Sequence, residues 1–297
     1  MSSPPSRSGV AALILLSLIW GYTWVAMKEA VRFIDPFDFS ALRAIAGALL
    51  MFAAMVWLGK SFRLRSPGRT LVFGLFQTTG FNALAAWALY TGAAGKTAVL
   101  VYTLPFWTLV IAWPLLGERL RGLQWPATLL AAAGLLLVFE PWQLGGTIVS
   151  KVLALATALS WAMSAVLAKK WREALEPDLL TLTAWQMLLG GVVLTMIAFS
   201  IPTRDIEWTP YFWFVLIYCI LAGSIAGWLL WLFILRRLPA GVAGLSIMAV
   251  PALGVLFARV QLGERPSAAE WSGMLLIGAS LALLSWYALR ATAGQKR

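Results

Sequence analysis

Long apolar segments recur along the whole chain, and they limit its fold more than any other feature of the sequence. About 20 apolar residues in a helix, at a rise of ~1.5 Å each, cross a hydrocarbon core ~30 Å thick. The composition agrees, because 61% of the 297 residues are hydrophobic and only 12% are charged. So little polar surface does not cover a soluble globule of this size. We therefore expect an all-α integral membrane protein without a soluble domain.

Polar and turn-forming residues divide the apolar sequence into ten expected transmembrane helices. The clearest boundaries are the Ser66-Pro67-Gly68 run and the prolines Pro202 and Pro239, which interrupt helices. No small-residue cleavage site follows the first apolar run, so we predict an uncleaved first helix. The expected helices cover residues 10–28, 39–58, 71–89, 94–116, 125–139, 148–169, 180–199, 211–235, 241–262 and 268–289.

The distribution of Lys and Arg predicts the orientation of these helices. If the N-terminus is cytoplasmic, the loops on that side hold about twice as many of these residues as the loops opposite, in agreement with the positive-inside rule. We expect a multi-pass protein of the bacterial inner (plasma) membrane with both termini cytoplasmic. The net charge of +11 then reflects topology. The expected partners are the lipid bilayer and a small-molecule substrate, not nucleic acid; a monomer is sufficient and a dimer is allowed.

An internal repeat is the most informative pattern in the sequence. Residues 105–119 read PFWTLVIAWPLLGER and residues 251–265 read PALGVLFARVQLGER, so proline and Gly-Glu-Arg coincide after one shift of 146 residues, from 105 to 251. Such self-similarity indicates a duplicated structural unit. Coincidental likeness between apolar segments is the alternative. Further matches occur earlier in each half: Trp20 with Trp161 and Lys28 with Lys169 at a shift of 141, and Gly47 with Gly190 at a shift of 143.

An odd number of helices in each copy dictates how the two copies face. A tandem copy of a five-helix unit enters the membrane from the opposite side, so the two repeats are inverted. We place the first repeat at residues 1–145 and the second at 146–297, around a central cavity. Many secondary transporters follow this plan, with the substrate site near the membrane midplane between the repeats.

Several short motifs resemble those of one transporter family. They are the Trp-Gly-x-x-Trp run at residues 20–24, the Leu-Arg-x-x-x-Gly run at 42–47, and the Leu-Gly-Glu-Arg runs at 116–119 and 262–265. Together with the repeat, they resemble the drug/metabolite transporter superfamily, EamA-like branch, over essentially the whole chain. The resemblance implies a ten-helix exporter of small metabolites, often amino acids, that works by alternating access between the repeats.

Two repeated residue types are candidates for hinges or gates. Pro105 and Pro251 lie within expected helices, where each removes a backbone donor and bends or breaks the helix. Freed carbonyls must face protein or a water-lined cavity, which brings these helices beside a transport path. A rigid packing kink is the alternative. Glu118 and Glu264 recur at the same place in each repeat, where they predict loop capping or an ion pair at a gate.

Only one charged residue, Arg43, falls in the body of an expected helix. It could hold the carboxylate of a substrate, or it could make a structural or gating contact; the second interpretation is the favoured one. All twelve acids fall in loops or at helix ends, and the chain has no histidine. Without a proton carrier in the spans, we predict a neutral or zwitterionic substrate that moves down its own gradient.

Aromatic and polar side chains within the expected helices predict the lining of the substrate cavity. Trp20 and Trp24 with Ser17 form a stripe at helical spacing, and Gln77 adds an amide to the third helix. An indole or amide in hydrocarbon needs a partner, although ordinary packing between helices is the alternative for each residue. The full expected set comprises Trp20, Arg43, Thr78, Asn82, Tyr102, Trp107, Trp161, Ser164, Gln186, Ser224 and Trp228.

These patterns predict a transporter that exports small neutral or zwitterionic metabolites, with amino acids, including aromatic ones, implied by the family resemblance. A channel or lipid scramblase with the same inverted fold is the alternative. A carrier of phosphorylated or nucleotide sugars is another, although Arg43 alone offers little cationic grip. We expect no enzymatic activity, because histidine and paired intramembrane acids are missing from the sequence. No cofactor or metal is expected.

Overall fold

The computed structural model describes residues 7–117, 122–139, 148–201, 204–227, 229–230 and 249–294. Within these ranges every regular element is a helix, and each of the ten expected segments contains helical residues. Five helical spans are long and apolar enough to cross a membrane, one of them running from Ala94 to Leu116 through α5 and α6, and three shorter apolar helices accompany them among the residues described. The expectation of an all-α membrane fold is confirmed. The helices begin and end as follows: α1 Arg7–Ala30, α2 Pro36–Trp57, α3 Pro67–Gly74, η1 Leu75–Gly80, α4 Phe81–Thr91, α5 Ala94–Val101, α6 Leu104–Leu116, α7 Gln124–Phe139, α8 Ile148–Lys170, α9 Leu179–Ser200, α10 Pro210–Tyr218, η2 Cys219–Ala226, α13 Ala249–Leu262 and α14 Ala268–Gly294.

The third and eighth expected helices each contain a π-helical segment that the sequence pattern did not predict. The segment η1 joins α3 to α4, and η2 follows α10 directly. A shift of 146 residues, from 75 to 221, brings all of η1 onto η2. π-Helical turns are rare within α-helical segments and often mark functional sites. Their recurrence at one position in both repeats therefore indicates that they belong to the duplicated unit.

The fourth expected helix is broken at Tyr102 and Thr103, between α5 and α6. Pro105 lies in the first turn of α6, where a residue without an amide proton costs no intrahelical hydrogen bond. The predicted break is therefore present, and it falls just before the proline. Pro251 lies near the start of the described part of α13.

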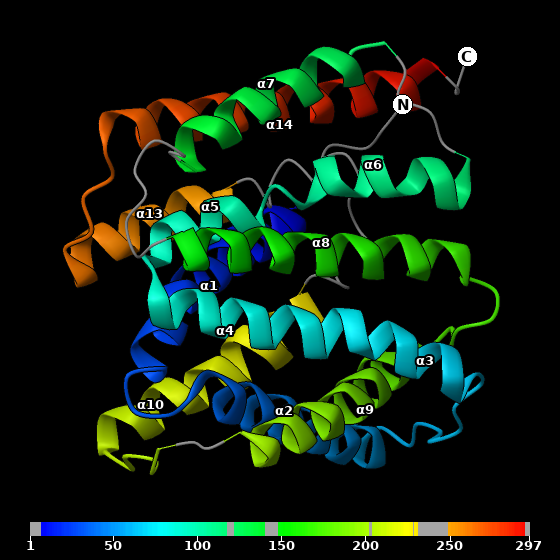
Figure 1. Ribbon diagram of the computed structural model, residues 1–297. Coiled ribbons are helices and arrows are strands. Elements are labelled where there is room, and N and C mark those ends of the chain that lie inside the picture. The colour runs from blue at the N-terminus through cyan, green and yellow to red at the C-terminus, as the bar shows by residue number, and fades with distance from the viewer. Residues whose placement is uncertain are drawn as a thin grey trace.

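Two helix pairs demonstrate that the repeats are inverted. In the α2–α9 pair, Gly47 packs on Met187 whereas the later residue Lys60 bonds the earlier residue Asp178, so the two helices run antiparallel. The same holds for α7 and α14, where Gly134 packs on Gly273 and Ala127 accepts a hydrogen bond from Ser280. Figure 1 shows these pairs at opposite edges of the bundle. Each pair joins a helix to its own counterpart, as a twofold axis between inverted repeats requires.

The remaining helices lie between these two pairs and follow the same symmetry. The helix α1 packs on α13 and α10, while its counterpart α8 packs on α6 and α4 (Figure 1). Exchanging the repeats converts one set of neighbours into the other. The largest apolar core is formed by side chains of α1, α4, α5, α10 and α13.

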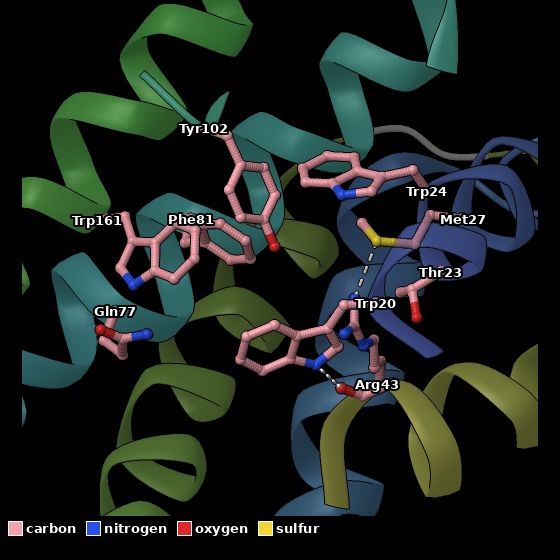
Figure 2. Close-up of a pocket in the computed structure, with 10 residues that line it drawn as sticks. Trp20, Thr23, Trp24, Met27, Arg43, Gln77, Phe81, Tyr102 and Trp161 are labelled. Carbon is pink, nitrogen blue, oxygen red and sulfur yellow. Dashed lines mark hydrogen bonds between the residues drawn. The ribbon is translucent and has the colours of Figure 1, made fainter. Parts of the chain in front are cut away.

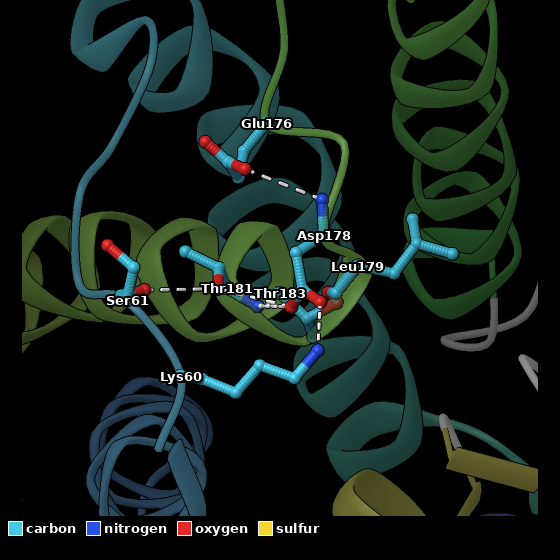
Figure 3. Close-up of polar contacts among 7 residues, drawn as sticks. All are labelled: Lys60, Ser61, Glu176, Asp178, Leu179, Thr181 and Thr183. Atoms are coloured by element: carbon cyan, nitrogen blue, oxygen red, sulfur yellow. Dashed lines mark hydrogen bonds and ion pairs between the residues drawn. The ribbon is translucent and has the colours of Figure 1, made fainter. Parts of the chain in front are cut away.

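We name the two ends of the bundle after residues that lie there. The Arg204 end contains residues 31–35, 92–93, 204–209 and 263–267, and the Lys60 end contains residues 58–66 and 171–178. At the Lys60 end, Asp178 caps α9 by accepting from the backbone amide of Thr181 and also pairs with Lys60 (Figure 3). This loop contact fixes the first repeat against the second at the edge of the bundle.

Candidate functional site

A small cavity lies between the two repeats, and its lining side chains are drawn in Figure 2. Its volume is about 60 Å³, well below the ~300 Å³ at which small-molecule pockets usually begin. Side chains of α1, α2, η1, α4 and α8, the Tyr102 break and the backbone of η2 surround it. The lining residues are Trp20, Thr23, Trp24, Met27, Arg43, Gln77, Phe81, Tyr102, Trp161 and Gly223.

A chain of aromatic rings forms one wall of the cavity. The rings of Phe81 and Trp161 lie edge to face with centroids 5.2 Å apart, and the rings of Trp161 and Tyr102 follow at 5.8 Å. Trp24 continues the chain at 6.3 Å from Tyr102. Edge-to-face contacts fix ring orientation, so this wall is a preformed apolar surface. In Figure 2 the hydroxyl of Tyr102 points into the centre of the group.

Arg43 places a guanidinium at the opposite side of the cavity. Arg43 is only 8% exposed, and the partners of its side-chain hydrogen bonds are neutral. Nε donates to the hydroxyl of Ser224 at 2.9 Å, and an Nη atom lies 3.1 Å from the sulfur of Met27. No carboxylate within the described ranges forms an ion pair with it. A buried cation without an acidic partner favours an anionic group in the adjoining space.

The Arg43–Ser224 contact has a counterpart in the other repeat. Gln186 accepts a hydrogen bond of 2.6 Å from the hydroxyl of Thr78. A shift of 143 relates Arg43 to Gln186, and a shift of 146 relates Thr78 to Ser224. Each contact joins the second helix of one repeat to the π-helical segment of the other. The two sides therefore share one construction and differ in charge, since only one carries a cation.

The first helices of the repeats contribute a second matched set. Trp20 donates from Nε1 to the carbonyl oxygen of Gly223 at 3.0 Å, so its indole is fixed against η2. On the other side, Ser164 donates to the Oε1 atom of Gln77 at 2.5 Å, so the amide on η1 is held from α8. Trp161 is the counterpart of Trp20 and lies across the cavity from it (Figure 2).

The structure brings together only part of the set predicted from sequence. Four of those residues line the cavity, and Ser164 and Ser224 lie directly behind it in contact with lining residues. Thr78 instead donates to Gln186 between η1 and α9, and Asn82 donates to the carbonyl oxygen of Thr78, one turn earlier in its own helical segment. Trp107 lines a groove between α6 and α7 and donates to Thr103. The four lining residues are Trp20, Arg43, Tyr102 and Trp161; Trp228 and Glu118 lie outside the described residues.

Glu264 contacts the first repeat at the Arg204 end. Its two carboxylate oxygens accept hydrogen bonds from the backbone amides of Ala94 and Gly95, at 2.6 and 2.9 Å. These are the first amides of α5, which have no partner within the helix and which favour a negative charge. Glu264 thus joins the end of α13 to the start of α5 across the repeat interface.

Other contacts join the repeats at the same end. Arg204 donates to the carbonyl of Val31 at 2.8 Å, and its backbone amide donates to Asp35 at 2.7 Å. Ser150 donates to the carbonyl of Ala88 at 2.8 Å. Lys96 and Glu270 form an ion pair between α5 and α14. The Arg204 end is therefore connected across the repeat interface by several polar contacts.

Four lining residues were not singled out from sequence: Thr23, Met27, Phe81 and Gly223. Thr23 and Met27 follow Trp20 at helical spacing, so the stripe beginning at Trp20 was the signal that could have revealed them. Phe81 carries no such signal, because an apolar ring in an apolar helix looks the same whether it faces lipid or a cavity. Gly223 contributes backbone, which side-chain patterns do not report.

Comparison with known proteins agrees with this architecture. The EamA-like transporter family matches the chain at residues 7–140 and again at residues 149–286. The "Uncharacterized transporter YoaV" of Bacillus subtilis (strain 168) is 29% identical over 273 residues, which cover 89% of this chain and 92% of that protein. The "Uncharacterized inner membrane transporter YedA" of Escherichia coli (strain K12) is 27% identical over 278 residues, covering 92% and 89%.

One solved structure has the same fold. It aligns with a TM-score of 0.68 at 20% sequence identity and covers 96% of this chain and 98% of its own. At this identity the likeness concerns the fold alone. The two family matches, which together span most of the sequence, carry the assignment. This chain is a membrane transporter and belongs to the EamA-like transporter family.

Proposed function

We propose that this transporter exports small neutral or zwitterionic metabolites, with amino acids, including aromatic ones, as the main class. The observation that carries the proposal is the cavity between the repeats, which has one cation on one side and a wall of aromatic rings on the other. An amino acid offers the complementary pair of groups. Its carboxylate fits the guanidinium of Arg43, and its side chain fits against Trp161 and Phe81.

The size of the cavity and the contacts around it support transport by alternating access between the repeats. A volume of about 60 Å³ holds a few water molecules but no amino acid. The cavity must therefore widen to bind, and the repeats must move apart at one end. The contacts of Glu264 and Arg204 favour a state in which the Arg204 end is shut.

The charge distribution supports export from the cytoplasm. In the topology expected from the sequence, the loops on the side of Lys60 hold about twice as many Lys and Arg as the loops opposite, so the positive-inside rule assigns that side and both termini to the cytoplasm. The Arg204 end then faces the outside. Since the sequence has no histidine and all its acids fall at helix ends or in loops, substrate movement down its own gradient without proton exchange is the simplest coupling.

Counterflow in liposomes tests this proposal directly. Vesicles loaded with unlabelled phenylalanine or alanine are diluted into trace labelled substrate, with and without a pH gradient. We expect saturable, stereoselective accumulation that does not depend on the pH gradient. Uptake that never saturates would support a channel or scramblase instead. Exchange restricted to phosphorylated or nucleotide sugars would change the cargo, and a steep dependence on the pH gradient would contradict gradient-driven transport.

A further inference from the structure

A basic hollow lies at the Lys60 end, away from the central cavity. It opens between the first turn of α3 and the end of α8, and its volume is about 440 Å³. Four of its seven lining residues are cations, and a single carboxylate, Glu173, accompanies them. The cations are Arg69, Lys169, Lys170 and Arg172.

Three of these cations have no ion-pair partner within the described part of the chain. No ion pair there involves Arg69, Lys170 or Arg172, and all three side chains are exposed. A neighbouring hollow at the same end provides the contrast. There Lys60 pairs with Asp178, and Glu176 lies close by (Figure 3). Excess positive charge is therefore concentrated beside α8.

The position of the hollow relative to the lipid identifies the kind of anion that it fits. Lys170 is the last residue of α8, and Leu159 lies eleven residues earlier on the same face, about three helical turns deeper. The side chain of Leu159 is 39% exposed, and that of Val72, one turn after Arg69 on α3, is 37% exposed. The cations thus lie at the ends of helices that carry exposed apolar side chains, where lipid headgroups are expected, and the indole of Trp171 lines the same hollow.

We infer that this hollow binds the phosphodiester headgroup of an anionic phospholipid, with Arg69, Lys170 and Arg172 holding the phosphate and the acyl chains lying along α8 and α3. Basic pockets at the ends of transmembrane helices suit such headgroups. Arg in particular presents paired donors to phosphate oxygens. A soluble anion would pair with the cations but would leave the neighbouring apolar side chains uncovered. This site does not depend on what the central cavity carries.

Lipid addition to the purified full-length protein tests the inference. Dioleoylphosphatidylglycerol or dioleoylphosphatidylcholine is added in detergent, and the thermal unfolding midpoint and the lipids retained in native mass spectrometry are measured. We expect phosphatidylglycerol to raise the midpoint and to be retained. The triple variant R69Q/K170Q/R172Q should lose at least half of that shift. The matched control, R63Q/R65Q, removes two exposed cations from the neighbouring hollow and should keep it.

Several results would overturn the inference. An equal shift in the triple variant and the wild type would exclude these cations as the binding site. An equal loss in R63Q/R65Q would indicate general surface charge and no specific hollow. Inorganic phosphate alone, if it reproduced the shift, would identify a soluble anion and not a lipid. All five substituted side chains are exposed, and the single variant K170Q provides a milder test if the triple variant does not fold.

Discussion

The guanidinium of Arg43 donates to the hydroxyl of Ser224 at 2.9 Å, across 181 positions of sequence and across the repeat interface. At the symmetry-related position in the other repeat, the equivalent hydrogen bond joins Thr78 to Gln186. One contact of the pair is therefore charged and faces the cavity, while the other is neutral and faces away from it. A duplicated unit has become asymmetric at the point where a polar substrate would bind.

Replacing Arg43 by Gln should remove this asymmetry. A hydrogen bond to a charged group is worth about 1.5–3 kcal/mol, which corresponds to roughly a 10- to 150-fold change in affinity. We expect the KM for phenylalanine to rise by at least tenfold and the KM for phenylalaninamide, which lacks the carboxylate, to change much less. Counterflow with both compounds measures this. Equal losses for the two would mean that Arg43 acts as a structural or gating contact.

Trp161→Ala should open a gap in the aromatic wall. Trp161 contacts Phe81 and Tyr102, at centroid distances of 5.2 and 5.8 Å, and each such pair contributes about 0.5–1.5 kcal/mol beyond its buried area. We expect transport of phenylalanine to weaken several-fold more than transport of alanine. Trp161→Phe is the matched control and should retain most activity. If both amino acids are affected alike, the indole supports the bundle and does not select the substrate.

Removing the Glu264 carboxylate should loosen the Arg204 end. Glu264→Ala leaves the amides of Ala94 and Gly95 without their partner, and each lost charge-assisted bond costs about 1.5–3 kcal/mol. Cys219→Ser removes the native thiol, and Thr23→Cys places a single thiol in the cavity. In this background we expect a membrane-impermeant thiol reagent applied at that end to label the cavity at least about tenfold faster. Arg265→Ala, which changes an exposed neighbour, should leave labelling unchanged. Unaltered labelling in Glu264→Ala would mean that the carboxylate does not hold this end shut.

The sequence allowed the helices to be predicted well and the cavity only in part. Apolar length and loop signals place helix ends to within a few residues, as at α8, because lipid imposes one length on every span. Which face a residue takes is harder to infer. Gln77 lines the cavity whereas its neighbour Thr78 turns toward α9, and one residue of rotation, altered by the π-helical turn, decides between them. The π-helical segments could not be predicted, because no periodicity of apolar residues distinguishes them from the α-helix around them.

Asp178 should make part of the stability depend on pH. Partial burial acts to raise its pKa, but hydrogen bonds from Lys60 and Thr181 and the charge of Lys60 outweigh burial, so the pKa of this carboxyl lies below its ordinary value. Because the pKa is depressed in the folded state, the ionised carboxylate stabilises the fold. This stabilisation is fully present above the unfolded pKa of about 3.9 and is lost as the pH falls through the folded pKa. Asp178→Ala, which also removes the helix cap, should cost about 0.5–2 kcal/mol at pH 7.

Asp178→Asn separates the charge from the cap, because asparagine also caps helices well. We expect the difference in thermal unfolding midpoint between wild type and Asp178→Asn to be full at pH 7 and to shrink below about pH 4. Lys60→Gln should reproduce the charge effect. A difference that stays constant over this range would mean that the Lys60–Asp178 pair contributes nothing measurable, as is common for exposed ion pairs.

Two glycines of α14 give a matched test of the contact between α7 and α14. A Cβ atom at Gly273 would lie 2.5 Å from the carbonyl oxygen of Gly134 and 2.7 Å from a methyl group of Val138, whereas a Cβ atom at Gly278 meets nothing within 4 Å. Gly273→Ala should therefore force the helices apart and destabilise the protein by about 1–3 kcal/mol. Gly278→Ala should be neutral or stabilising by up to about 1 kcal/mol, because alanine favours helix. Thermal unfolding in detergent measures both, and equal effects would contradict the close contact between Gly134 and Gly273 in this pair of counterpart helices.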